Sequence, residues 1–165
     1  MSLAHPIQRL LDRAAISDAK HAFIRAADAR DPDRLVARFV DDCMAYYELG
    51  GPPIVGRAAL RAWYADRLAE VTASSHHLSN LEFDFHDDDS ATVYSYFLSW
   101  QHFANYPERP DRNRYARYKD IWVKRDGEWW QTTLYVFPAG EWNFADRPRF
   151  GGYDGWDADL LRGGR

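Results

Sequence analysis

Apolar side chains recur mainly at helical spacing in the first 71 residues, and from residue 77 on they alternate with a period of two. Residues 8–30 predict a helix, "RDPDRL" predicts a short second helix with Pro32 in its first turn, and residues 55–71 predict a third. Charged residues, including Asp12 and Lys20, fall mostly between the apolar positions of the first helix. Those apolar positions are Ile16, Ala19, Phe23 and Ala26 or Ala27.

Strands are predicted first at "CMAYYELGG", which ends at a glycine–proline turn, and then at residues 77–85, 91–102, 114–124 and 129–137. Helices followed by hairpin-linked strands are typical of an α+β fold. We expect a cone-shaped α+β barrel in which a curved, mostly antiparallel sheet surrounds the helices and encloses a site for a small molecule. This domain is expected to span residues 1–140. Residues 141–165 are expected to form an aromatic and glycine-rich tail that covers the pocket or contacts another subunit.

Charge and cysteine content narrow the class of protein. The formal net charge of the 165 residues is -4 and no basic patch stands out, which disfavours nucleic acid and membrane surfaces as partners. The single cysteine cannot form an internal disulfide and no apolar run is long enough to span a bilayer, so a cytoplasmic location is expected. Aromatic residues make up 16% of the chain, which suits a lined pocket or a contact between subunits.

Two adjacent histidines in "SSHHLSN" stand at the start of a predicted strand. Side chains on a strand alternate between its faces. His77 has the parity of the apolar residues in the following "LEFDF", and His76 has the parity of its acidic residues. The alternation therefore predicts that His77 points to the interior and His76 to solvent. In the next strand, His102 shares its parity with a mostly aromatic set of residues and is expected to point inward.

Asp28 lies at the border of the apolar stripe of the first helix, where its carboxylate could reach the interior. A carboxylate beside an imidazole fixes the tautomer and favours the protonated form, so the histidine can act first as a base and then as an acid. Asp28 and His77 are the candidate pair. The alternative is that His77 is a buried histidine whose ring nitrogens are hydrogen-bonded and have no catalytic role.

Other sequence patterns give no sign of a metal or a cofactor. The run "HDDD" is expected to be a solvated turn, not a metal site. The chain has neither a phosphate-binding glycine loop nor a nucleophile-elbow motif. Few positive charges fall near the proposed site in the sequence, which disfavours a strongly anionic substrate.

Four segments together resemble the SnoaL-like branch of the nuclear transport factor 2-like superfamily, over residues from about Ile16 to Val136. They are "AADARDPDRLVARFVDDC", "IVG", "SSHHLSN" and "RYKDIWVKRDGEWW". The resemblance implies a cone-shaped α+β fold. Within the superfamily the pattern is most similar to the scytalone dehydratases.

This resemblance places Asp28 at the catalytic aspartate, Tyr47 at a tyrosine that holds a water molecule, and His77 and His102 at the two catalytic histidines. The second water-holding tyrosine would fall at Ala27, so the substrate is expected to differ. The implied activity is a cofactor-independent lyase that eliminates water from a cyclic or aromatic β-hydroxy carbonyl substrate.

In this reaction, His77 would be the base oriented by Asp28, Tyr47 would donate a hydrogen bond to the developing enolate, and His102 would bind or polarise the substrate. The residues expected to line the pocket are Tyr46, Trp63, Tyr64, Phe83, Tyr96, Trp100 and Tyr118. A homodimer or homotrimer is expected. The alternatives are an isomerase or polyketide cyclase on the same fold, and a non-catalytic ligand-binding or assembly subunit.

Overall fold

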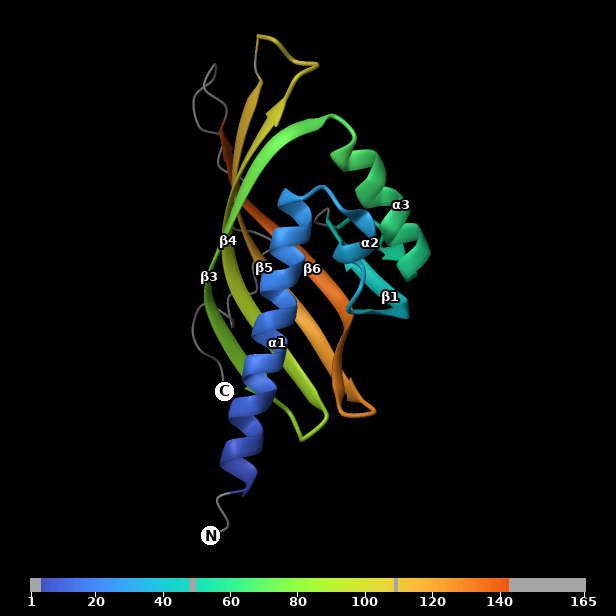
Figure 1. Ribbon diagram of the computed structural model, residues 1–165, viewed down its shortest axis with the longest axis vertical. Helices are drawn as coiled ribbons and strands as arrows, with labels where there is room; N and C mark the ends of the chain where they lie inside the picture. Colours follow the sequence, from blue (N-terminus) through green and yellow to red (C-terminus); the bar gives the residue numbers. More distant parts are fainter. Residues whose placement is uncertain (1–3, 48–49, 109, 143–165) are drawn as a thin grey trace.

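The computed structural model describes residues 4–47, 50–108 and 110–142, in which helices lie against a strongly curved sheet (Figure 1). The helices are α1 (Ala4–Asp28), α2 (Pro32–Leu35) and α3 (Arg57–Leu68). The strands are β1 (Phe39–Tyr46), β2 (Ile54–Val55), β3 (Val71–Phe85), β4 (Ser90–Phe103), β5 (Asp111–Arg125) and β6 (Glu128–Trp142). The predicted order of helices and strands is confirmed, and β2 is a short strand that the alternation did not predict. The predicted tail at 141–165 lies almost entirely outside the described residues.

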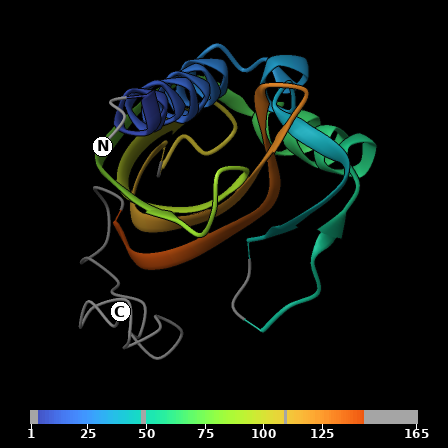
Figure 2. The ribbon, with the colours of Figure 1, turned by 90° about the horizontal axis from the view of Figure 1, so that it is seen from below.

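The strands form one sheet in the order β2-β1-β6-β5-β4-β3. Neighbouring strands are antiparallel except for β1 and β6, which run parallel. Seen from below, the sheet bends into an open arc and α1 lies across the opening of that arc (Figure 2). The expected α+β cone with a mostly antiparallel sheet is therefore confirmed, with β2 and β3 as its two edges.

Local chemistry explains where several elements begin and end. Asp31 caps α2 by accepting a hydrogen bond from the backbone N–H of Arg34 at 3.0 Å, and Pro32 occupies the first turn. The turn between β5 and β6 has positive φ at both Asp126 and Gly127, as a tight hairpin turn requires. None of the helices in the described ranges has the length and apolar character needed to cross a membrane.

The buried residues form two clusters on the concave face of the sheet. The larger cluster lies under α2, α3 and the second half of α1, and it includes Phe23, Phe39 and Leu60. The smaller cluster lies under the first half of α1 and includes Ile16 and Trp122. Both halves of α1 therefore pack against the concave face, and the candidate site lies at the C-terminal end of the helix.

Candidate active site

The C-terminal end of α1 is fixed against the start of β3. Arg30 adopts a left-handed conformation with φ 54°, and the backbone N–H of Asp31 donates to the carbonyl of Ala26 at 3.0 Å, which ends the helix. The Arg30 guanidinium donates to the backbone carbonyls of Val71, at 3.3 Å, and of Thr72. These contacts hold the last turn of α1, and therefore Asp28, beside β3.

The Asp28 carboxylate accepts three hydrogen bonds from β3. Its Oδ1 accepts from Nδ1–H of His76 at 2.6 Å and from the hydroxyl of Ser74 at 3.1 Å, and its Oδ2 accepts from the backbone N–H of His76 at 3.1 Å. A carboxylate only accepts, so the hydrogen of the neutral His76 ring lies on Nδ1 and the Nε2 lone pair is available. No described residue hydrogen-bonds Nε2. The His76 side chain is only 10% exposed.

The prediction that His77 pairs with Asp28 is wrong, because β3 contains a bulge. Between Ser79 and Glu82 the register with β4 shifts by one residue, and Asn80 has a positive φ of 32°. The extra residue reverses the alternation, so His76, not His77, shares the inner face with the apolar residues beyond the bulge. His77 lies on the outer face, where its Nε2 hydrogen-bonds the hydroxyl of Ser75 at 3.1 Å.

His102 also lies on the outer face of the sheet, which corrects a second prediction. Apart from Thr92, the buried residues of β4 have the opposite parity, from Ala91 to Gln101, so the aromatic set that includes Tyr96, Trp100 and His102 faces outward. His102 Nδ1 pairs with Asp111 Oδ1 of β5 at 2.7 Å, and it is 38% exposed. Tyr96 and Trp100 therefore do not line the site.

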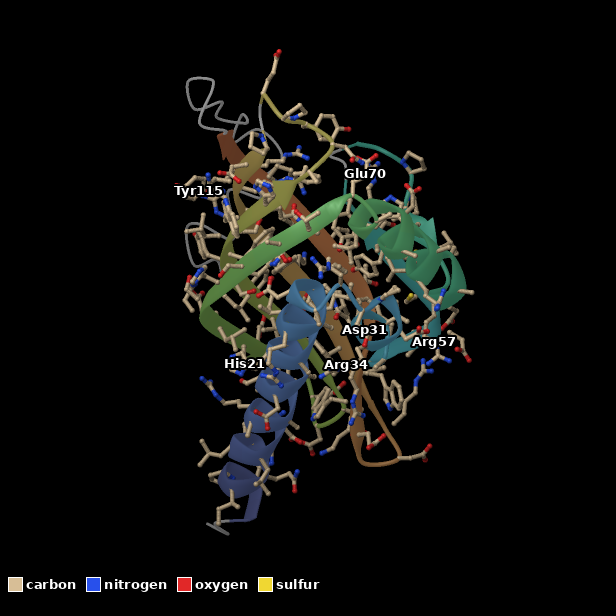
Figure 3. The ribbon with its side chains drawn as sticks, turned by 45° about the horizontal axis from the view of Figure 1, so that its top comes forward. His21, Asp31, Arg34, Arg57, Glu70 and Tyr115 are labelled. Carbon is tan, nitrogen blue, oxygen red and sulfur yellow. The ribbon has the colours of Figure 1, made fainter. Side chains whose placement is uncertain are left out.

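Tyr46 lies outside the site as well, and Phe83 lies away from the pair. Tyr46 stacks on Tyr135 of β6, with ring centroids 4.6 Å apart, on the outer face. Phe83 packs against the smaller buried cluster, where the guanidinium of Arg13 lies 4.5 Å from its ring centroid. Figure 3 shows Tyr115, another outer-face residue, on the side of the sheet farthest from α2 and α3.

Four of the predicted residues do meet on the concave side. The hydroxyls of Tyr47 and Tyr64 are 2.6 Å apart and hydrogen-bonded, and the Trp63 ring lies 4.2 Å from that of Tyr47. A series of ring contacts leads from these residues to His76. It runs from Tyr64 through Phe23, Tyr118 and Phe97 to His76, with ring centroids between 4.4 and 6.5 Å apart.

The three inner tyrosines are held as neutral hydrogen-bond donors. Burial raises the pKa of Tyr47, Tyr64 and Tyr118 well above the usual range, because the charged phenolate loses its hydration there. Tyr47 and Tyr64 together have two hydroxyl hydrogens, and their mutual hydrogen bond uses one. The pair can therefore donate the other hydrogen to an oxygen of a bound molecule.

A buried ion pair beneath the site was missed at the sequence level. Lys20 Nζ lies 2.8 Å from Asp120 Oδ2, both side chains are fully buried, and Gln131 donates to Asp120 at 2.8 Å. The ammonium also lies 4.0 Å from the ring centroid of Tyr118. Burial raises the pKa of Asp120, and the Lys20 charge acts in the opposite direction. The pair ties the middle of α1 to β5 under the aromatic wall.

A cleft of about 600 Å³ opens elsewhere, between α1, α2 and the turn that joins β5 and β6. Its lining includes Phe23, Phe39, Trp122 and Trp129, but neither Asp28 nor His76. The candidate site is therefore defined by the paired side chains and not by the size of this opening.

Fold and site define the class of protein, a small α+β cone with a histidine–aspartate pair on its concave side. The family model of the SnoaL-like domain matches residues 8–135, so the chain belongs to this family, within the nuclear transport factor 2-like superfamily. A search of curated proteins found no match.

Solved structures support the same assignment. The chain is 27% identical to the "Putative Scytalone Dehydratase" of Novosphingobium aromaticivorans, with a TM-score of 0.77, over 88% of this chain and 95% of that one. It is 20% identical to hexachlorocyclohexane dehydrochlorinase LinA-type3 of Novosphingobium barchaimii, with a TM-score of 0.75, over 89% and 99%. A type 2 LinA dehydrochlorinase is 22% identical, with a TM-score of 0.77, over 89% and 97%. The two LinA structures show the shared fold alone.

Proposed function

We propose that the protein is a cofactor-independent lyase that eliminates water from a cyclic or aromatic β-hydroxy carbonyl substrate. The observation that supports this most is the Asp28–His76 pair, in which Nδ1–H is committed to the carboxylate and Nε2 is left as a base. His76 would remove the proton next to the carbonyl and then return it to the departing hydroxyl. Asp28 would stabilise the imidazolium that forms between the two steps.

The hydroxyl pair of Tyr47 and Tyr64 would stabilise the developing enolate. It has one hydrogen to donate, and burial keeps both phenols protonated. Donors that are fixed before the reaction and shielded from water stabilise charge that develops in the transition state. The ring wall of Trp63, Phe97 and Tyr118 would bind a planar substrate.

An elimination assay with a set of cyclic β-hydroxy ketones in D₂O tests this proposal. Mass spectrometry reports the loss of one water molecule, and NMR reports deuterium at the carbon next to the carbonyl. Loss of water that requires His76 supports the lyase. Deuterium incorporation or rearrangement at unchanged mass would support an isomerase or cyclase instead. If His76→Gln matches the wild type on every ketone, the acid–base proposal is wrong.

A further inference from the structure

Arg114 lies in the same cross-strand row of the sheet as His76, although the sequence separates them by a whole hairpin. His76 of β3 pairs in register with Ser99 of β4, and Ser99 pairs in register with Arg114 of β5. Residues directly opposite each other on neighbouring strands share a face. Ser99 is buried on the concave side, so His76 and Arg114 lie in one inner row, about 10 Å apart across two strand spacings.

The charge of Arg114 acts within the site. It lowers the pKa of both Tyr47 and Tyr118, against the larger opposite effect of burial, so its guanidinium lies within electrostatic reach of both hydroxyls. In the neighbouring inner row, Ser74 is in register with Gln101, and Gln101 with Arg112. The sheet therefore brings two arginines of β5 to the side of the site opposite Asp28 and His76.

We infer that the substrate carries an anionic group, a carboxylate or an acidic phenol, and that Arg114 binds it. The guanidinium presents a planar fork of donors that matches a carboxylate. A ring that places its reacting carbon at His76 Nε2 would direct a substituent on its far side toward β5. This inference rests on the proposed function and narrows its substrate class. It also replaces the sequence-level expectation that the substrate is not strongly anionic.

A binding experiment without turnover tests the inference, with salicylate and its neutral amide, salicylamide, as probes. Dissociation constants come from NMR titrations that follow the His76 ring and the inner tyrosines. We expect wild-type protein to bind salicylate at least about tenfold more tightly than salicylamide, because a charge-assisted hydrogen bond is added. Arg114→Gln should remove this preference and Arg114→Lys should restore part of it. The control Arg25→Gln, on the exposed face of α1, should leave it unchanged.

Equal affinity for the two probes in the wild type, or no saturable binding of either, would overturn the inference. So would a preference that survives in Arg114→Gln, or one that only Arg112→Gln removes. If Arg114→Gln does not fold, the inference is tested by the affinities of the wild type for salicylate and salicylamide and by the same two affinities in Arg114→Lys. If the protein eliminates water from a ketone but binds salicylate no more tightly than salicylamide, only the inference of an anionic substrate is rejected. If the wild type eliminates water from none of the ketones, and the preference for salicylate is present in both the wild type and His76→Gln, only the proposed lyase activity is rejected.

Discussion

Among the described residues, two histidine–aspartate pairs with nearly equal nitrogen–oxygen distances lie on opposite faces of one sheet. His76 Nδ1 lies 2.6 Å from Asp28, and His102 Nδ1 lies 2.7 Å from Asp111. The inner pair joins the end of α1 to β3, across 48 residues of sequence, and Ser74 adds a further hydrogen bond. The outer pair joins two residues directly opposite each other on neighbouring strands.

Their surroundings decide what each pair can do. His76 is 10% exposed beside the Phe97 ring, and His102 is 38% exposed on the convex face. Charges act more strongly where water is excluded, and fixed donors help catalysis only where a substrate binds. A short contact between a histidine and a carboxylate is therefore not by itself evidence of catalysis. The concave location and the tyrosines around it distinguish the inner pair.

The largest expected effect separates the two histidines directly. His76→Gln should lower the rate of elimination by about 10²- to 10⁴-fold, because general acid–base catalysis is lost. His102→Gln should change the rate by less than about twofold, because it lies on the other face of the sheet. The comparison is made on kcat/KM for any ketone that the wild type converts. An equal loss of kcat/KM in His76→Gln and His102→Gln would contradict the claim that only the inner pair is catalytic.

A third pair, Lys20–Asp120, shows what a fully buried pair does when its role is structural. Lys20→Met should lower the free energy of unfolding by about 3–5 kcal/mol, because Asp120 is left without its cationic partner. The double variant Lys20→Met/Asp120→Asn should regain more than half of that loss. Urea denaturation measures both, and the exposed pair supplies the control, since Arg61→Gln should leave stability nearly unchanged. A Lys20→Met variant as stable as the wild type would contradict a structural role for the Lys20–Asp120 pair.

Replacing the two carboxylates tests the orientation of each imidazole. Asp28→Asn should reduce kcat on the order of 10²-fold, because the neutral amide no longer stabilises the imidazolium and can support the other tautomer. Asp111→Asn should leave kcat unchanged. The matched measurement is steady-state kinetics of the two variants at the same pH. An Asp28→Asn enzyme with wild-type kcat would show that His76 does not depend on its partner.

The smallest expected effect concerns the inner tyrosines at high pH. Burial raises the pKa of Tyr47 and Tyr64 above the unfolded value of about 10, so folding favours their protonated forms. That stabilisation is complete below pH about 10 and is lost as the pH rises through the folded-state pKa. Tyr64→Phe should therefore move the alkaline unfolding midpoint to higher pH, as followed by circular dichroism. Tyr115→Phe, on the exposed outer face, is the control, and equal midpoints in all three proteins would contradict this expectation.

The fold was predictable because most elements have strong local signals. The helical spacing of α1, the proline in the first turn of α2, and the short hairpin connection between the last two strands each agree with the tertiary structure. The expected places of Asp28 and Tyr47 on the concave side agree with the structure, because neither residue belongs to β3, where the bulge reverses the alternation. Lys20 is counted in the sequence among the charged residues between the apolar positions, yet it falls four residues after Ile16 and four before Ile24, on the buried stripe.

The assignment of His77 failed for a physical reason that one residue could have revealed. Alternation predicts faces only in a regular strand, and Asn80 tolerates the positive φ that a bulge uses. The expectation that His102 points inward failed for a different reason. The outer face of β4 carries more aromatic residues than the inner face, so the apolar character of a face did not show which side is buried. Arg114 could not be found from the sequence, because only the pairing of β3, β4 and β5 brings it to His76.

The ¹⁵N chemical shifts of the His76 ring test the central claim most directly, and they need no substrate. At a pH where the ring is neutral, we predict that its hydrogen lies on Nδ1 in the wild type and that Asp28→Ala removes this preference. His102 should respond only to Asp111→Ala. A His76 ring with its hydrogen on Nε2, or one whose shifts are the same in the wild type and Asp28→Ala, would contradict a base oriented by Asp28.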